Sequence, residues 1–292
     1  MSYQLSEYLL ADQRKMSLAK NYFAWQARLV LPHLGRRVVE VGSGIGNFTG
    51  LLLDRELVVA NDLDPAALGE LRNRYGEREN LRTVLCDAAG PRFAEVAQFA
   101  PDSCVCLNVL EHIADDGAAL RNMAKILPPG GVVVLLVPAF PALYGPIDRN
   151  LGHFRRYTRR ALVAAAEGTG LVPRRLGYVN LAGWFGWWWN ARVAGREEQS
   201  EAQIAVFDRW IVPVVSRLEA LAPAPFGQSL LAVLESAVGG RTDNATDRSD
   251  HLDALGNCGA PQILIDCRQR AVLAHGDFKI GGIVGGQTVF TA

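Results

Sequence analysis

Short apolar runs alternate along this chain with segments of helical periodicity. Five runs rich in β-branched residues are bounded by polar turns, as is typical of buried strands: 37–41, 57–60, 81–85, 103–107 and 132–137. Residues 65–75 and 116–127, which lie between such runs, can form helices. Because strands that alternate with helices form parallel sheets covered on both faces, the pattern predicts a doubly wound α/β fold.

The pattern extends on both sides of this region. Residues 3–34 have helical spacing and are ended by Pro32 and Gly35, so 1–35 is predicted to be an N-terminal helical cap. Residues 158–167 predict another helix with Thr158 as its N-cap, and 171–179 and 229–235 predict two more strands. Residues 36–238 would thus form the main domain, with 180–227 as an insert rich in Trp and Pro.

The last part of the chain has a different composition. From residue 239 the sequence is polar and rich in turn-forming residues. We expect 239–292 to be a C-terminal extension that is disordered or accessory. Residues 262–267 could form a strand, but no partner strand for it is evident from the sequence.

A Gly-rich turn follows the first predicted strand. The strand runs through Glu40 into Gly42, Gly44 and Gly46, and a helix is expected after this turn. Glycines allow positive φ and let a ligand lie against bare backbone. The spacing GxGxG departs from the dinucleotide fingerprint GxGxxG, because Asn47 occupies the position of the third Gly. The turn therefore favours a ligand other than a pyrophosphate, although a tight strand-to-helix connection alone would explain it equally simply.

Polar residues also follow the next three strands. Asp62 lies 22 positions after Glu40, where an acid can accept hydrogen bonds from ribose hydroxyls. Asp87 ends the third strand, where a carboxylate can accept from an adenine amino group, and Asn108 ends the fourth. The carboxyl ends of parallel strands share one edge of the sheet, where ligands bind. Four such positions in order predict a cofactor site at this edge.

With these residues in place, the chain resembles the class I S-adenosylmethionine-dependent methyltransferases. The resemblance implies a Rossmann-like seven-stranded sheet whose last strand is antiparallel, and S-adenosyl-L-methionine as the cofactor. It implies the following cofactor-binding set: Glu40, Gly42, Gly44, Gly46, Asp62, Leu63, Asp87, Ala88 and Asn108. In this assignment the glycines hold the methionine part, Asp62 the ribose, and Leu63 and Asp87 the adenine. Residues 137–145 and 152–158 further resemble a bacterial subgroup with no assigned acceptor.

The segment after the fifth strand covers the transferred methyl group in this fold. Residues 138–180 hold seven Arg against Asp148 and Glu167, which suggests a basic lid and an anionic acceptor, or simply a solvated surface. His153 and His112 are candidates for a general base, and Tyr157 could orient the acceptor. Each could equally be structural. No residues have the spacing of a metal site, so we expect none.

The segment 184–189, with four Trp residues, has three interpretations. It could be an aromatic wall over the acceptor, a weak contact with a membrane surface, or packing of the insert onto the sheet. No apolar run is long enough to span a membrane, and charges near the N-terminus argue against a signal peptide. With five Cys and no CxxC pair, we expect a cytoplasmic protein.

The composition also limits the partners. The chain has 30 Lys and Arg against 30 Asp and Glu, and this zero net charge argues against a general nucleic-acid binder. The sequence therefore predicts a methyltransferase that acts by in-line displacement on a small-molecule or lipid-like acceptor. Two alternatives remain at this point, namely an NAD-type oxidoreductase and a non-catalytic module that binds S-adenosylmethionine. The sequence does not indicate an oligomeric state.

Overall fold

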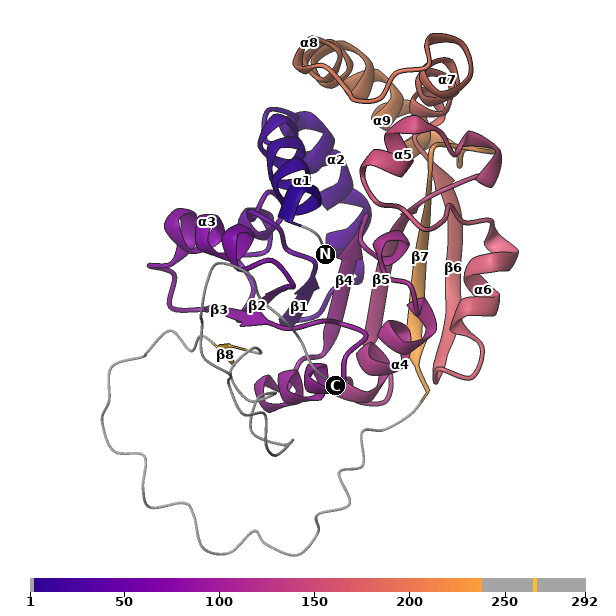
Figure 1. The fold of residues 1–292 in the computed structure, drawn as a ribbon. Helices are drawn as coiled ribbons and strands as arrows, with labels where there is room; N and C mark the ends of the chain where they lie inside the picture. Colours follow the sequence, from indigo (N-terminus) through magenta and orange to yellow (C-terminus); the bar gives the residue numbers. More distant parts are fainter. Residues whose placement is uncertain (1–2, 238–264, 267–292) are drawn as a thin grey trace, which may run out of the picture.

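A single mixed sheet organises the chain, and a computed structural model describes residues 3–237 and 265–266 of it (Figure 1). The strand order is β6-β7-β5-β4-β1-β2-β3-β8. The strands are β1 (Arg37–Val41), β2 (Leu57–Asp62), β3 (Leu81–Leu85), β4 (Ser103–Leu107), β5 (Val132–Pro138), β6 (Leu171–Val179), β7 (Ser229–Ser236) and β8 (Ile265–Asp266). Neighbours pair in parallel except β7, which is antiparallel to both β5 and β6. Strands β1–β7 confirm the predicted seven-stranded arrangement with an antiparallel last strand, and β8 adds a short eighth strand beside β3.

Helices cover both faces of this sheet. The α-helices are α1 (Tyr3–Met16), α2 (Lys20–Val30), α3 (Pro65–Tyr75), α4 (Asp116–Ile126), α5 (Pro146–Asn150), α6 (Arg159–Ala166), α7 (Leu181–Trp189), α8 (Glu201–Val206) and α9 (Val212–Leu221). Short 3₁₀ turns are η1 (Leu31–His33), η2 (Thr49–Leu51), η3 (Pro91–Phe99), η4 (Leu110–His112) and η5 (Pro141–Leu143), and η6 (Asn190–Ala194) and η7 (Phe207–Ile211) are π-helical.

Two apolar cores lie on the opposite faces of the sheet. On one face α4, α6 and η3 contribute residues such as Met123, Leu162 and Phe93. On the other face α2 and α3 contribute residues such as Trp25 and Leu68. The central strands are consequently buried on both sides, which explains their continuous apolar runs.

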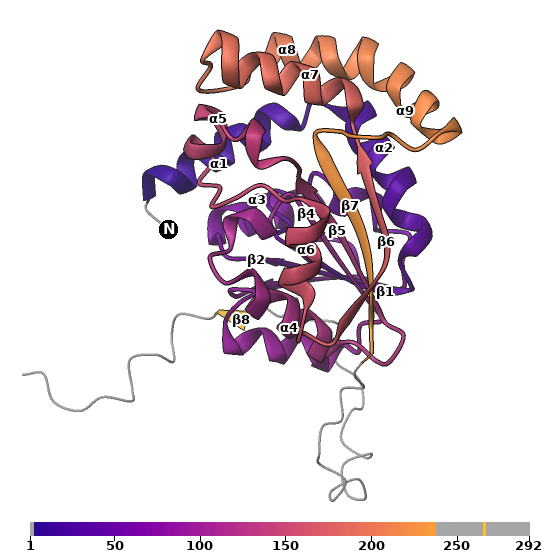
Figure 2. The same cartoon turned by 90° about the vertical axis from the view of Figure 1, so that its right-hand side faces the viewer.

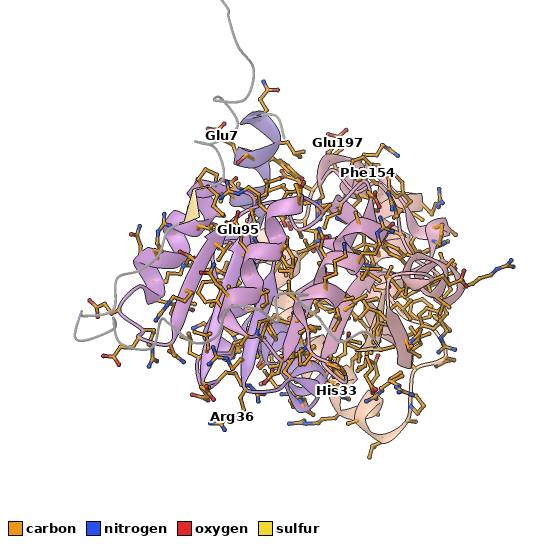
Figure 3. The ribbon with its side chains drawn as sticks, turned by 90° about the horizontal axis from the view of Figure 1, so that it is seen from below. Glu7, His33, Arg36, Glu95, Phe154 and Glu197 are labelled. Atoms are coloured by element: carbon orange, nitrogen blue, oxygen red, sulfur yellow. The ribbon has the colours of Figure 1, made fainter. Side chains whose placement is uncertain are left out.

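The carboxyl edge of the parallel strands is covered by added elements. Helices α1 and α2 lie over the β1 side, while α7, α8 and α9 lie above the ends of β6 and β7 at the top of Figures 1 and 2. Viewed from below, Phe154 and Glu197 lie on the side opposite His33 and Arg36 (Figure 3). The predicted insert therefore forms a helical layer above the edge where the cofactor site was expected.

Local capping explains several boundaries. Thr158 caps α6 as predicted, because its hydroxyl accepts a hydrogen bond from Ala161 N at 3.1 Å. The helical region expected over 3–34 forms two helices, α1 and α2, which are separated after Met16. There Ser17 Oγ donates to the Arg14 carbonyl at 2.6 Å, and such a bond competes with helix propagation.

Two other expectations about elements were wrong. The Gly-rich turn leads into the short turn η2 rather than a helix, where Gly50 has low helix propensity and the Thr49 hydroxyl is held by Glu40. The strand expected within 262–267 does have a partner, because β8 pairs in parallel with β3 through Val84 and Leu85. The rest of 239–292 lies outside the described residues, so the expectation of disorder there stays a prediction, as does the division into domains.

Candidate cofactor and acceptor site

The Gly-rich loop has the backbone that its sequence predicts. Gly42, Gly44 and Gly46 all have positive φ, at 71°, 53° and 85°. A Cβ added at Gly42 would lie 2.3 Å from a methyl group of Val109, so a side chain cannot be accommodated there. The Gly44 N–H donates to Asp62 Oδ2 at 2.7 Å, which ties this loop to the end of β2. The loop and the predicted ribose acid thus form one unit.

Two buried carboxyl groups support this unit. Asp62 also accepts from Asp64 N at 2.9 Å, and burial raises the pKa of its carboxyl group. Glu40, at the end of β1, accepts from the Thr49 hydroxyl at 2.6 Å. Burial raises the pKa of Glu40 to about 8, so this side chain is largely protonated at neutral pH.

The predicted adenine side lies on the surface beside this loop. Leu63 is 51% exposed, and Asp87 Oδ1 accepts from Ala89 N at 2.9 Å while Ala88 is buried. Cys86 N donates to the Asp62 carbonyl at 3.1 Å, so the ends of β2 and β3 are held together. These three predicted residues do not line the adjacent cavity. Their role toward adenine stays a prediction.

Helix α1 closes over the Gly-rich loop. Gln13 Oε1 accepts from Ile45 N at 3.0 Å, and the Gln13 carbonyl accepts from Asn47 Nδ2 at 2.8 Å. A Cβ on Gly44 would lie 2.4 Å from Gln13 Oε1, so the two segments are in close contact. Asn47, which replaces the third glycine of a dinucleotide fingerprint, therefore anchors the helix that covers the loop.

A cavity of about 250 Å³ extends from this loop. Its lining includes Glu40, Ser43, Gly44 and Ile45 in and beside the loop, and also Asn108, Glu111, His112, His153 and Arg156. Four buried polar atoms of its lining residues have no hydrogen-bond partner: Ser43 Oγ, Gln26 Nε2 and both carboxylate oxygens of Glu111. Buried polar atoms are rarely left unpaired, so this cavity suits a polar ligand. The loop and these unpaired atoms fit the polar methionine part of S-adenosylmethionine.

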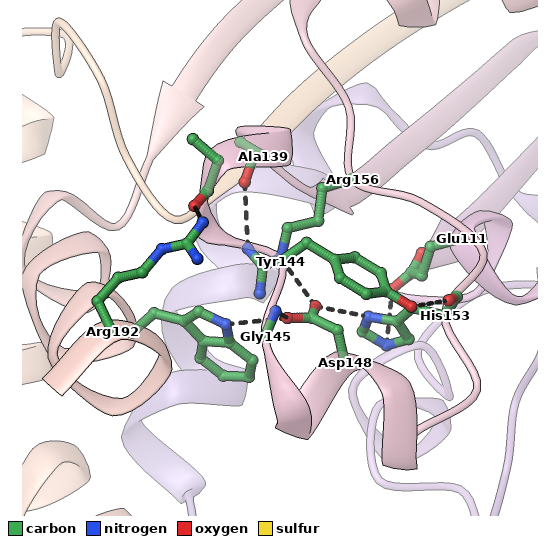
Figure 4. Close-up of polar contacts among 10 residues, drawn as sticks. Glu111, Ala139, Tyr144, Gly145, Asp148, His153, Arg156 and Arg192 are labelled. Carbon is green, nitrogen blue, oxygen red and sulfur yellow. Dashed lines mark hydrogen bonds and ion pairs between the residues drawn. The ribbon is translucent and has the colours of Figure 1, made fainter. Parts of the chain in front are cut away.

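His153, one of the predicted bases, lines this cavity and lies between two carboxyl groups (Figure 4). Its Nδ1 is 2.9 Å from Asp148 Oδ1, and its Nε2 is 3.9 Å from Glu111 Oε1. The Asp148 carboxylate is fully buried and also accepts from Arg156 Nε at 2.8 Å and Gly145 N at 2.9 Å. Burial would raise the pKa of Asp148, but the hydrogen bond from His153 and the Arg156 guanidinium outweigh burial and lower it.

Glu111 was not among the residues predicted from the sequence. It is fully buried, and burial raises its pKa to about 7 despite the nearby His153. An unpaired buried carboxyl group that titrates near neutral pH is typical of functional sites. Its only sequence signal was its place beside His112 after the fourth strand. Asp148 was equally difficult to identify from the sequence, because it is one of two acids in a basic segment.

The two other predicted catalytic residues have different surroundings. The His112 ring packs edge-on against His153 at 4.6 Å, and burial together with His153 lowers its pKa to about 3, which makes it a weak base. Tyr157 is 2% exposed and donates its hydroxyl proton to Asp116 at 2.7 Å. It does not line the cavity. Of the three candidates, His153 has the geometry of a proton acceptor.

The same three side chains could also hold a metal ion. Ligand atoms of Glu111, His112 and His153 all lie within 4.8 Å of one another, and they form the one such group found among residues 3–237. No metal site is expected from the sequence, because these residues share no local motif. Folding brings His153 next to a pair that lies 41 positions earlier in the chain.

The residues of the basic lid and of the Trp-rich segment do not share one location: some line the cavity, and others lie outside it. Of the seven Arg residues, Arg156 lines the cavity and is paired with Asp148, while Arg155 pairs with Asp116 at 2.7 Å. Trp187 also faces the cavity and donates to Asp148 at 3.3 Å, whereas Trp188 is 42% exposed. The seven Arg residues therefore do not converge on the cavity, because Arg156 is the one among them that lines it. No described helix has the length and apolar character required to cross a bilayer.

Comparisons with known proteins agree with this geometry. The model of a methyltransferase domain family matches residues 10–176. Over 143 residues the chain is 29% identical to the ubiquinone/menaquinone biosynthesis C-methyltransferase UbiE of Legionella pneumophila, covering 44% of this chain and 55% of that protein. Over 108 residues it is 31% identical to the ubiquinone biosynthesis O-methyltransferase of Alkalilimnicola ehrlichii, covering 34% and 40%. The chain thus spans about half the length of the curated relatives that it matches.

A solved structure shows the same fold. The putative methyltransferase crystallised with the Haloferax volcanii Trm112 methyltransferase activator has a TM-score of 0.56 and 17% identity, over 82% of this chain and all of that one. The family match covers more than half of the sequence and includes the Gly-rich loop, Asp62, Glu111 and His153. On this evidence the chain belongs to the methyltransferase domain family, within the class I S-adenosylmethionine-dependent methyltransferases.

Proposed function

We propose that this protein transfers a methyl group from S-adenosylmethionine to a small organic acceptor, and that His153 receives the acceptor's proton. The observation that carries the proposal is the cavity that joins the Gly-rich loop at Gly44 to His153 and Glu111. A cofactor held at the loop would share one cavity with this base, which supports the proposal.

The chain's residues would hold the cofactor through the loop and the strand ends. Gly44 and Ser43 would contact its methionine part, and Asp62 and Asp87 would accept hydrogen bonds from the ribose and the adenine. When bound, S-adenosylmethionine supplies an activated methyl group with a neutral leaving group. The protein's contribution is then to align the acceptor, exclude water and take up one proton.

The proton would be taken up at His153 Nε2. Asp148 accepts the Nδ1 proton, and this hydrogen bond selects the tautomer whose Nε2 lone pair is free. The Glu111 carboxylate, 3.9 Å away, would stabilise the resulting imidazolium. Helix α1 and the insert cover the site and limit the access of water.

The residues that line the cavity bear on the charge of the acceptor. Arg156 is neutralised by Asp148, so the anionic acceptor suggested by the basic lid gains no additional support. The curated relatives are named for O- and C-methylation in quinone biosynthesis, which supports a small organic acceptor. The family match leaves the NAD-type oxidoreductase without support.

The test is cofactor binding followed by product detection. Calorimetry should show binding of S-adenosylhomocysteine near micromolar concentrations, and NADH should not compete. The protein would then be incubated with isotopically labelled S-adenosylmethionine and a metabolite extract, and mass spectrometry should detect a labelled methylated product. Binding without product in repeated extracts would favour the non-catalytic module instead.

A further inference from the structure

The outer face of the helical insert is apolar where a surface helix is normally polar. Helices α8, η7 and α9 form a continuous helical run over 201–221. Exposed apolar side chains follow one face of this run at intervals of three and four residues: Val206, Trp210, Val214, Leu218 and Leu221. Trp210 is 65% and Leu221 is 85% exposed. The inward face already carries the packing residues Ile204 and Val212, so this outer stripe is not needed for the core.

Helix α7 and η6 present a matching stripe. Phe185, Trp188, Trp189 and Val193 are exposed, at 55%, 42%, 56% and 52%. We call this stripe and that of 206–221 together the apolar cap. Large exposed apolar surfaces of this kind mark interaction sites, and tryptophan favours the interface between water and lipid.

The exposed charges within the apolar cap itself are basic, whereas the segment 194–205 that joins its two stripes also holds exposed acids, of which Glu198 pairs with Lys15. Over 185–193 and 206–221 the exposed charged residues are Arg192, Arg209 and Arg217. The two acids in these ranges face inward, since Asp208 accepts from Tyr22 N at 2.8 Å and Glu219 from Leu181 N at 2.8 Å. Basic residues among exposed aromatic and aliphatic side chains are complementary to an anionic lipid surface.

A second cavity connects the apolar cap to the cofactor site. It has a volume of about 530 Å³ and lies between α7, α8, η7 and the junction of α1 with α2. Trp189, Val206 and Ile211 of its lining are also exposed on the outer surface. Five residues line both this cavity and the cofactor cavity: Met16, Tyr22, Trp187, Gln199 and Gln228. The two cavities therefore adjoin, and these five residues form the boundary between them.

We propose that the apolar cap docks on an anionic membrane surface, and that the second cavity holds the hydrocarbon chain of an acceptor drawn from that membrane. The polar end of such an acceptor would then reach His153 in the first cavity. The identification of the bound molecule as the acceptor rests on the proposed function, whereas the docking does not. The acceptor class is thus an amphiphile with a long hydrocarbon chain.

Docking is tested by sedimentation with vesicles. The full chain should sediment with vesicles of phosphatidylcholine containing phosphatidylglycerol, and less with phosphatidylcholine alone. The double variant Trp210→Glu/Leu218→Glu should bind at least about tenfold more weakly, because it places charges in the stripe. Val172→Glu, which alters an exposed apolar residue on β6, is the matched control and should bind like the wild type.

Three results would overturn the docking. These are no sedimentation of the wild type with either vesicle, undiminished binding of the double variant, and a dimer in solution that the double variant abolishes, which would assign the cap to a second copy of the chain. Binding of S-adenosylhomocysteine is measured in parallel and should be equal in all three proteins. Its absence from the wild type would refute the proposed function while leaving the docking result valid.

The second cavity is tested with a hydrocarbon probe in the absence of vesicles. Diphenylhexatriene should fluoresce on binding to the wild type and be displaced by hexadecanol. Gly186→Phe should reduce this binding at least about fivefold, because Gly186 lines the cavity and open space adjoins it. Gly69→Phe, at a helical glycine of α3 with equally open space, is the control. Absent probe binding, or equal binding by Gly186→Phe, would refute the lipid-chain site.

Discussion

His153 Nδ1 lies 2.9 Å from Asp148 Oδ1, inside a fully buried cluster that also ties Arg156 and Gly145 to the same carboxylate. This contact fixes the ring of His153 with Nε2 turned toward Glu111. A histidine held by a carboxylate on one nitrogen and free on the other is prepared to accept a proton.

Asp148→Asn should lower kcat by at least about 100-fold, because the amide no longer selects the required tautomer of His153. His153→Ala should have a comparable effect, and the double variant should be no worse than either single variant, since both act through one group. Steady-state kinetics with the identified acceptor measures this. Additive losses in the double variant would contradict a shared role.

Glu111→Gln should change the pH dependence of the reaction. Because burial raises the pKa of Glu111 to about 7, we expect the wild-type rate to fall as pH drops through about 7, where the carboxylate gains a proton and no longer stabilises the imidazolium. In the variant kcat should be lower and the pH profile should lose the contribution of Glu111 near pH 7. An unchanged profile would exclude Glu111 from the reaction.

The same substitution makes a prediction for stability. The folded-state pKa of Glu111 lies above its unfolded value of 4.5, so its contribution to stability is greatest below about 4.5 and is lost as pH rises through about 7. Glu111→Gln should therefore match the wild type in thermal unfolding near pH 5 and unfold at a higher temperature at pH 8. A variant that is less stable at pH 8 would show that the charged carboxylate is stabilised in the fold.

Asp62→Ala should weaken the binding of S-adenosylhomocysteine at least tenfold, or about 1.4 kcal/mol. The variant loses both the ribose acceptor and the hydrogen bond that holds Gly44 N. Calorimetry measures this, with Asp54→Ala on the surface after η2 as the control. Retention of full affinity would show that the cofactor site lies elsewhere.

Tyr157→Phe separates a structural role from a catalytic one. The substitution removes the hydrogen bond to Asp116 and should cost about 1 kcal/mol of folding stability, which lowers the unfolding temperature by about 2–4 °C. We expect kcat to stay within about twofold of the wild type. A large loss of kcat with an unchanged unfolding temperature would restore Tyr157 as a catalytic residue.

Chelation tests the alternative use of Glu111, His112 and His153. If these side chains serve in proton transfer, prolonged treatment with EDTA should leave kcat within about twofold. Loss of activity that is restored by added Mg²⁺, Mn²⁺ or Zn²⁺ would instead assign a divalent cation to the group. The binding of S-adenosylhomocysteine, measured before and after chelation, controls for unfolding.

The conformation of the Gly-rich loop could be predicted from the sequence, because it depends on residues that are close together along the chain. Gly42, Gly44 and Gly46 indicate a turn that requires positive φ. Asp62 is the last residue of β2, so the strand itself determines its position. Parallel strands then bring their carboxyl ends to one edge of the sheet, so residues that end successive strands must be neighbours. The apolar runs likewise determine the centre of the sheet, since strands such as β1, β4 and β5 are buried on both faces.

The acceptor half was decided by tertiary structure. Glu111 and Asp148 are unremarkable acids in the sequence, and they gain their properties only when folding excludes water from them and places His153 between them. Tyr157 has a side chain suited to a site, but in the structure its hydroxyl group donates to Asp116 instead. The residue types and their periodicity by themselves determined the sheet and the conformation of the Gly-rich loop. Burial and long-range pairing determined the surroundings of Glu111, Asp148 and His153, because desolvation and the distance between charges are properties of the folded chain.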